Sequence, residues 1–247
     1  MKIVRLSWAG VQVESEGATL VIDLLEHTAP IRSFMGDPRL PIAFGPEVLD
    51  LALVTHLHPD HYDPDTLRRK LRPDAKVICD PANASKIARD GFTVVGATLY
   101  ESISAGPFTV TALPAVDGLG DPQISFLVEA EDIKVMHFGD TLWHGNWWKI
   151  RARCGPPNLA FLPINGAITQ FPNMTPSGIP ADLMPVQAAS AAAILEARVA
   201  CPMHYGAFHS PPVYVEFPDA ERTFLEAAGR LGILVQIIEP GKEIAIS

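Results

Sequence analysis

The sequence is poor in cysteine and contains no long apolar run. Its three cysteines, Cys79, Cys154 and Cys201, lie far apart, which excludes a CxxC metal or redox motif and gives no sign of a disulfide framework. No stretch approaches the roughly 18 consecutive apolar residues of a membrane span, and the residues up to Glu14 lack the apolar core of a signal peptide. We therefore expect three buried or idle thiols in a cytoplasmic protein with no membrane partner.

Basic residues are also scarce. The 247 residues include 19 Lys and Arg against 28 Asp and Glu, which gives a formal net charge of -9 at pH 7. This balance argues against a nucleic-acid partner, because binding to phosphates needs clustered positive charge. The expected partner is a small-molecule substrate, while a local basic pocket and a homo-oligomer both stay open.

The hydrophobic residues, 48% of the chain, fall into short runs separated by turn residues. Helical and β-prone runs alternate without a boundary or a repeat, which predicts a single α/β domain over residues 1–247. Two proline-rich loops are expected at 27–48 and 165–185. The expected strands are 2–6, 11–14, 19–22, 51–54, 76–78, 93–95, 108–113, 124–129, 133–136, 199–200 and 234–238. The expected helices are 64–71 with Asp63 as N-cap, one capped by Asp80 and Pro81 that runs to residue 88, 186–195, and 219–231.

The strongest chemical signal follows the apolar run at 51–54. His56, His58, Asp60 and His61 bring three imidazoles and a carboxylate into six positions. On an extended segment residues two apart point the same way, so His56 and His58 can hold one metal ion while Asp60 and His61, beyond the turn at Pro59, face a second. The alternative is a solvated polar loop. Histidine is infrequent and the loop follows a buried strand, so the pattern favours metal ligands.

Three further strand ends carry ligand-type residues. Asp117, Asp140 and His204 follow the expected strands 108–113, 133–136 and 199–200. Loops at the same edge of a sheet are neighbours, so these side chains are expected to converge on the histidine-rich loop. Taken alone, Asp140 could cap the turn after Gly139 and His204 could be a core histidine; their joint occurrence favours metal binding. Asp117 stays open between a ligand and an ordinary turn aspartate.

The remaining histidines are assigned other places. His137 lies on the strand side of the Gly139 turn and is expected to hydrogen-bond to a ligand rather than to be one. His27, His144 and His209 are expected at the surface or in a pocket. Among them His209 is the candidate for substrate contact, because it shares a loop with His204.

Together these segments resemble the metallo-β-lactamase superfamily of metal-dependent hydrolases. The resemblance rests on residues 56–61, on the turn at 138–141 and on residues 202–206, and it covers nearly the whole chain. Weaker similarities, such as those of residues 162–166 and of the helix before His204, favour a resemblance to the branch that contains L-ascorbate-6-phosphate lactonase. The resemblance implies an αββα sandwich, with two mixed sheets flanked by helices and a site for two divalent metal ions at one sheet edge.

The resemblance also implies a ligand assignment. It gives His56 and His58 to the first ion, Asp140 to a bridging position, and Asp60, His61 and His204 to the second ion. Asp117 stands where the family usually has a third histidine. An oxygen donor in place of an imidazole makes the first position harder, which shifts the expected metal from zinc toward manganese or iron.

The implied reaction is hydrolysis of a small ester, lactone or phosphoester by a metal-bound hydroxide, because a bound divalent ion lowers the pKa of water to about 7. Asp60 is the predicted catalytic residue, orienting the nucleophile and accepting its proton. Two other functions stay open. One is a phosphodiesterase or nuclease of the same fold, which the net charge disfavours; the other is a non-catalytic binding or sensor protein whose metal site Asp117 has altered.

Overall fold

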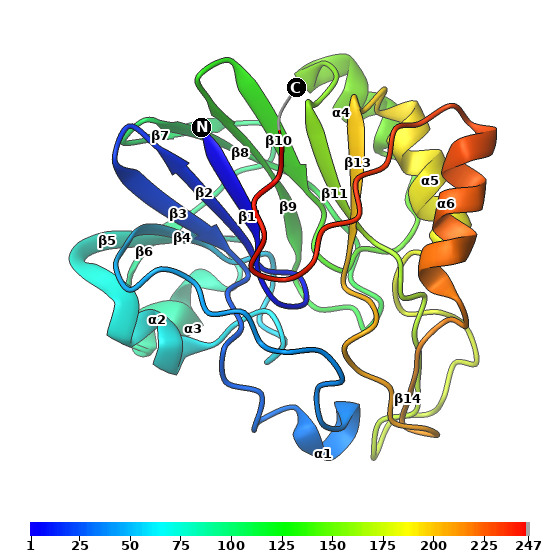
Figure 1. Cartoon of the computed structure of the whole chain (residues 1–247). Coiled ribbons are helices and arrows are strands. Elements are labelled where there is room, and N and C mark those ends of the chain that lie inside the picture. Colours follow the sequence, from blue (N-terminus) through cyan, green and yellow to red (C-terminus); the bar gives the residue numbers. More distant parts are fainter. Residues whose placement is uncertain (246–247) are drawn as a thin grey trace.

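The computed structural model describes residues 1–245, and its first sheet begins with the meander that the turns at the start of the chain predict. Its first three strands are antiparallel and the next three are added in parallel, in the order β1-β2-β3-β4-β5-β6 (Figure 1). The strands are β1 (Lys2–Arg5), β2 (Val11–Ser15), β3 (Ala18–Ile22), β4 (Leu49–Leu53), β5 (Leu71–Cys79) and β6 (Thr93–Gly96).

The second sheet is also mixed, in the order β13-β11-β10-β9-β8-β7. The four strands from β7 to β10 are antiparallel, each to the next along the chain. β11 and β13 then extend the sheet in parallel with β10. The strands are β7 (Ser102–Ala105), β8 (Phe108–Pro114), β9 (Ile124–Ala130), β10 (Ile133–His137), β11 (Leu159–Pro163) and β13 (Val199–Met203). A two-stranded ribbon, β12 (Ile168–Thr169) with β14 (Tyr214–Val215), lies beyond it.

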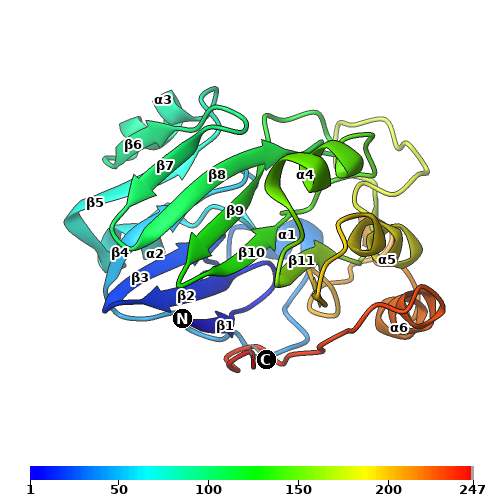
Figure 2. The same cartoon turned by 90° about the horizontal axis from the view of Figure 1, so that it is seen from above.

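Helices cover the outer face of each sheet, as the view from above shows (Figure 2). α2 (Pro64–Lys70) and α3 (Ala84–Arg89) bury Leu67 and Ile87 against the first sheet. α4 (Trp147–Cys154), α5 (Pro185–Ile194) and α6 (Ala220–Arg230) pack on the second, and the short α1 (Arg32–Met35) lies in the first proline-rich loop. The predicted αββα class, with two mixed sheets flanked by helices, is confirmed.

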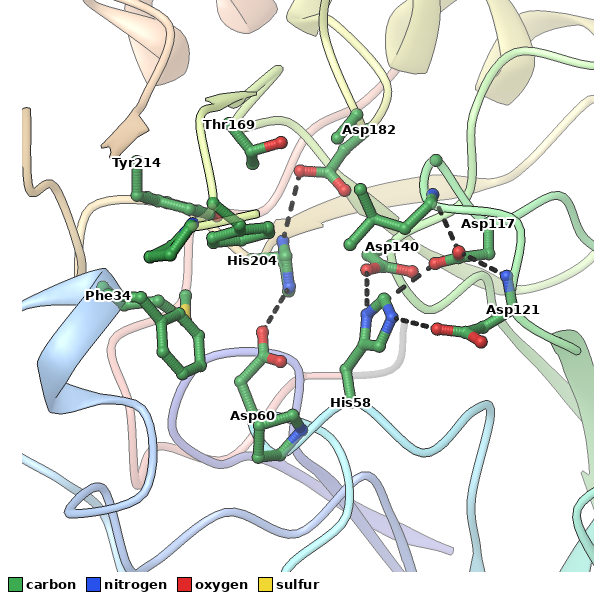
Figure 3. Close-up of a pocket in the computed structure, with 17 residues that line it drawn as sticks. Phe34, His58, Asp60, Asp117, Asp121, Asp140, Thr169, Asp182, His204 and Tyr214 are labelled. Carbon is green, nitrogen blue, oxygen red and sulfur yellow. Dashed lines mark hydrogen bonds and ion pairs between the residues drawn. The ribbon is translucent and has the colours of Figure 1, made fainter. Parts of the chain in front are cut away.

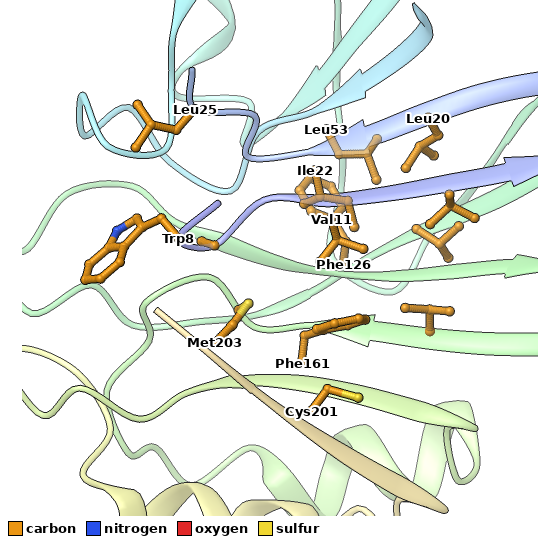
Figure 4. Packing of buried hydrophobic residues seen from close by; sticks show 14 of the residues in the cluster. Trp8, Val11, Leu20, Ile22, Leu25, Leu53, Phe126, Phe161, Cys201 and Met203 are labelled. Carbon is orange, nitrogen blue, oxygen red and sulfur yellow. The ribbon is translucent and has the colours of Figure 1, made fainter. Parts of the chain in front are cut away.

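The main core fills the space between the two sheets (Figure 4). Val11, Ile22 and Leu53 from the first sheet meet Phe126 and Phe161 from the second, and all five are essentially inaccessible to water. Alternation along each strand sends every second side chain into this layer, and the others face the helices. Burial between the sheets holds their edges together, and the predicted metal ligands lie at one of those edges.

Two predicted elements are wrong in detail. Residues 234–238 do not form a strand: the segment makes one bridge, between Val235 and Ala200, and the ladder stops because Pro202 has no N–H to donate to it. Asp80 does not cap α3. Its carboxylate accepts from the backbone N–H of Ala82 in a turn, and the helix begins at Ala84, after Asn83 at the N-cap position.

Other elements carried no sequence signal strong enough to predict them. β7 is a half-exposed edge strand, and α4 begins at Trp147 with no side-chain cap from Asn146 at the N-cap position. β11 is buried on both faces, so it shows no alternation. No helix among residues 1–245 is long and apolar enough to cross a membrane.

Candidate metal centre

All seven predicted ligands come together at one edge of the sandwich, in loops that follow strands. Figure 3 shows five of them, His58, Asp60, Asp117, Asp140 and His204. The histidine-rich loop follows β4, and Asp117, Asp140 and His204 follow β8, β10 and β13. β8, β10 and β13 run in the same direction, so their carboxyl ends share that edge. The sequence-distant groups therefore meet as expected, and their role as ligands stays a prediction.

The side chains form two groups. His56, His58, Asp117 and Asp140 make the first, and Asp60, His61 and His204 make the second; within each group one potential ligand atom per residue lies within 4.8 Å of the others. The division agrees with the assignment implied by the family resemblance. It also puts Asp117 in the first group, where the resemblance implies a third histidine.

Asp140 lies between the two groups. Its Oδ2 is 3.4 Å from His56 Nε2 and 3.9 Å from His61 Nε2, so a single carboxylate oxygen faces an imidazole of each group. Gly139 makes this placement feasible. It has φ +59, and a Cβ there would lie 2.7 Å from the Gln123 amide.

Several ligand atoms are buried without a hydrogen-bond partner. They are His56 Nε2, Asp117 Oδ1 and Asp140 Oδ1, all in the first group. An unpaired buried polar atom costs roughly 1–3 kcal/mol, so three of them in one place need another partner. In the second group, His61 Nε2 and His204 Nε2 face each other at 2.9 Å. Nitrogen and oxygen donors that converge in this way fit divalent metal ions.

Outer contacts fix the orientation of the imidazoles. His61 Nδ1 lies 2.8 Å from an oxygen of Asp23, and His58 Nε2 lies 3.0 Å from an oxygen of Asp121. His56 Nδ1 lies 3.0 Å from the Thr55 hydroxyl. A ring held through one nitrogen presents the other to the site, as metal-binding histidines usually do.

The site is strongly ionised. Burial disfavours the charged form of His61, but attraction to Asp60 and Asp23 outweighs burial and raises its pKa to about 9. Burial is likewise outweighed at His58, where a hydrogen bond and attraction to Asp140 raise the pKa to about 10. Despite its burial, Asp60 has a pKa below the usual range because of the neighbouring imidazoles. Imidazolium ions thus balance the negative charge of the carboxylates, and bound divalent ions would take over this role.

Trp8 is a contact that the sequence did not indicate. Its indole N–H donates to Asp60 Oδ2 over 2.9 Å, and its ring centroid lies 4.0 Å from that of His204. Trp8 and His204 both have positive φ, and the His204 N–H donates to the Trp8 carbonyl. The loop after β1 thus contacts two residues of the second group and helps to hold them in place.

Asp182 is another residue that sequence reasoning missed. It lies in the second proline-rich loop, is 4% exposed, and has a carboxylate oxygen 4.0 Å from His204 Nδ1. Burial, with repulsion from Asp140 and Asp60, raises its pKa well above the usual range. The only available signal was an aspartate in an otherwise apolar stretch, and nothing in that loop indicated that it folds back over the site.

The other histidines take varied positions. His137 does not hydrogen-bond to a ligand as predicted: its ring points between the sheets and lies 2.7 Å from the Ala9 carbonyl. His144 is buried and stacked on Trp147, and His27 is exposed. His209 does not line the cavity beside the two groups, so the structure gives it no contact with a substrate there.

A cavity of about 320 Å³ opens directly above the two groups. His58, Asp60, Asp140 and His204 form its floor. Phe34 of α1, Phe171 and Tyr214 stand around it, so both proline-rich loops contribute a wall. Its volume suits a small molecule.

Comparison with known proteins agrees with this geometry. The family described as "Beta-lactamase superfamily domain" matches residues 26–205, which include all seven predicted ligands. The chain belongs to this superfamily. The match thus covers the loops that carry the seven predicted ligands, while Trp8 and β14 lie outside it.

Relatives within the superfamily carry a common name. The chain is 26% identical over 219 residues to "UPF0173 metal-dependent hydrolase" of Thermococcus kodakarensis, covering 85% of this chain and 88% of the relative. It is 29% identical to the protein of the same name from Methanopyrus kandleri, covering 98% of each. The prediction of a metal-dependent hydrolase is confirmed at this level, while the likeness to the lactonase branch stays a prediction.

A solved structure shows the same fold. Igni18, described as a novel metallo hydrolase from Ignicoccus hospitalis, superposes with a TM-score of 0.71 at 21% identity, covering 98% of this chain and 97% of that one. The arrangement of sheets and helices is therefore that of a known metallo-hydrolase fold.

Proposed function

We propose that this superfamily member hydrolyses a small ester, lactone or phosphoester with the help of two divalent metal ions. One observation carries the proposal: two groups of ligand-type side chains, with unpartnered buried atoms in the first, share Asp140 beneath a cavity of about 320 Å³. A purely structural cluster would have its polar atoms paired within the protein.

The chemistry divides between the ions and the chain. Divalent ions in such a site supply a water of pKa about 7 and polarise the oxygen of the attacked group. The chain positions the water: Asp60 is held by the Trp8 indole and its lowered pKa keeps it ionised, so it can accept a hydrogen bond from the water and orient it. No serine or cysteine nucleophile is needed.

The donor set also bears on the metal. Asp117 adds a carboxylate to a group that already contains Asp140, so the first position combines two imidazoles with two carboxylates. Oxygen donors favour harder ions, and we propose manganese or iron ahead of zinc at this position. Neither alternative function gains support: among residues 1–245 no lysine or arginine lines the cavity, as a nuclease would need, and the Asp117 carboxylate lies with the other ligand-type side chains of the first group.

Metal content and chelator-sensitive turnover test the proposal together. Protein purified without chelator is analysed for zinc, manganese and iron, then assayed on a lactone, a carboxylic ester and a bis-aryl phosphodiester that release chromogens. We expect about two ions per chain and turnover that a chelator abolishes and the same metal restores. Protein with two ions per chain that hydrolyses no substrate of these three classes would contradict the proposal.

A further inference from the structure

The cavity above the two groups has two unlike sides. Five aspartate carboxyl groups line it, those of Asp60, Asp117, Asp121, Asp140 and Asp182. Figure 3 shows Phe34 and Tyr214 across from Asp117 and Asp121, and Met35, Phe171 and Pro172 add further apolar lining. Among residues 1–245, no lysine or arginine lines the cavity.

The charge balance disfavours an anionic substrate. The raised pKa of Asp182 disfavours its charged form, which leaves four charged carboxylates facing the cavity, and the four positive charges that two divalent ions would bring do no more than balance them. A phosphate or a second carboxylate on the substrate would therefore meet no net positive field and no guanidinium or ammonium partner. Sites that recognise such groups supply those partners.

The apolar side provides a place for a chain. Phe34 and Phe171 meet edge to face with ring centroids 5.5 Å apart, and both pack against the main core. Beyond Phe171 lies a second cavity of about 180 Å³, which shares Leu119, Thr169 and Phe171 with the first and continues along Met174 and Ile179. An apolar chain that starts above the ligands can run past Phe171 into this second space.

We propose that the substrate is an uncharged ester or lactone that carries an apolar chain, with its carbonyl over the two groups and its chain along Phe34 and Phe171. This inference rests on the proposed hydrolase function. Water adds to the carbonyl carbon and the bond from that carbon to the ester oxygen breaks; one proton of the water passes to the leaving oxygen and the other is released to solvent, which leaves the acid product as a carboxylate. This product acquires its charge beside the carboxylates that line the cavity, which favours its release.

A matched pair of esters tests the charge preference. The 4-nitrophenyl ester of hexanoic acid and the 4-nitrophenyl half-ester of adipic acid share leaving group and chain length and differ in a terminal carboxylate. We expect kcat/KM of the metal-loaded enzyme to be about tenfold or more higher for the hexanoate. Equal rates, or a preference for the half-ester, would overturn the inference while leaving a hydrolase in place.

Chain length and the aromatic wall are tested with variants. Hexanoate should exceed acetate in kcat/KM, because each buried methylene contributes about 0.8 kcal/mol. Phe171→Ala should lower kcat/KM for hexanoate about tenfold and lower it less for acetate, whose chain is shorter. Phe44→Ala is the control, since Phe44 is 71% exposed and lies outside both cavities. A uniform effect on both esters would contradict the proposed path of the chain.

Binding provides a readout that does not depend on turnover. Hexanamide and the half-amide of adipic acid are compared as ligands of the metal-loaded protein by ligand-observed NMR. We expect hexanamide to bind more tightly and Phe171→Ala to weaken it. The proposed hydrolase function fails if hexanamide binds but no ester, lactone or phosphoester is turned over, whereas the inference fails if the half-amide binds as well as hexanamide.

Discussion

Asp117 stands where the family resemblance implies a third histidine. One carboxylate oxygen accepts from the backbone N–H groups of Leu119 and Asp121, both over 2.8 Å, and the other is buried without a partner. The side chain thus organises its own loop and still presents a free oxygen to the first group. Both readings that the sequence left open for Asp117, turn residue and ligand, are compatible with this geometry.

Asp117→His tests the effect of the oxygen donor. We expect zinc to rise relative to manganese and iron, because an imidazole is a softer donor, and the thermal midpoint to fall because the loop loses two hydrogen bonds. The measurement is elemental analysis after growth with equal supplies of the three metals. Asp74→His, on the exposed part of β5, serves as control. An unchanged metal ratio would remove Asp117 from the ligand set.

Asp140→Asn tests the shared carboxylate. Asparagine keeps the size of the side chain but removes the charge that faces His56 and His61, so we expect a loss of at least one ion per chain and a fall in kcat/KM of about a hundredfold or more. Asp132→Asn, in the exposed β9–β10 turn, should change neither. Full activity with a full metal content in Asp140→Asn would rule out the bridging role.

How far single residues could be predicted depends on where they lie relative to strands. The seven predicted ligands follow strands, and the hydrophobic pattern locates strand ends well. Trp8 and Asp182 lie in loops that reach the site from distant parts of the sequence. Such long-range contacts leave no periodic signal in the sequence. His137 was misplaced because alternation along β10 turns it between the sheets, and its register was not fixed by sequence alone.

At the scale of elements, two loops meet closely beside the ligands. An added Cβ at Gly118 would lie 2.1 Å from the Ala181 carbonyl oxygen, so the loop after β8 and the segment before α5 touch through their backbones. This contact sets Asp117 and Asp182 on adjacent walls of the cavity. Glycine is required there by the close approach of the two chains.

Gly118→Ala should therefore separate the two loops. The clash is with backbone, which cannot move aside cheaply, so we expect a lower thermal midpoint and a higher KM, with a smaller effect on metal content than in Asp140→Asn. The matched control is Gly145→Ala, because a Cβ there meets nothing within 4 Å and Gly145 has no positive φ. A Gly118→Ala protein with unchanged KM and stability would show that the close contact between the two loops is not needed for either.

Elements with clear local signals were predicted and those without were not. α2 has Asp63 accepting from the Thr66 N–H and Pro64 in its first turn, which is the cap that the sequence predicts. α4 lacks such a cap, and the half-exposed β7 gave no strong apolar pattern. The expected strand at 234–238 failed for a tertiary reason, since its neighbour offers a proline where the ladder would continue.

At the scale of the whole molecule, the buried charged groups at the site edge reduce the stability that the apolar layer between the sheets provides. Burying imidazoles and carboxylates costs free energy, which their mutual attraction offsets in the absence of metal. The stability of the metal-free fold therefore depends on which of these groups carry a proton. That the chain forms one domain over residues 1–247 stays a prediction.

Metal-free protein should lose stability as the pH rises from 7 to 10. His58 and His61 have folded-state pKa values of about 10 and about 9, above the unfolded value of about 6.5, so their contribution is complete below pH 6.5 and disappears as the pH passes through 9 and 10. Asp60, whose folded pKa is lowered, acts oppositely: its contribution is present above about pH 4 and is lost in acid.

Urea unfolding with and without chelator measures this dependence. We expect the metal-free protein to lose a few kcal/mol of unfolding free energy between pH 7 and pH 10, and the metal-loaded protein to lose little, because bound ions replace the protons. Metal-free protein whose unfolding free energy is constant over this range would show that His58 and His61 carry no excess proton in the folded state.

The close contact between the Trp8 and His204 rings has an optical consequence. An indole whose N–H is held by one predicted ligand and whose ring lies 4.0 Å from another is a fluorophore built into the wall of the proposed centre. Its emission responds to whatever changes the charge or electron density of that imidazole. The fluorescence of Trp8 can therefore be used to follow the filling and emptying of the site in real time, without an added label.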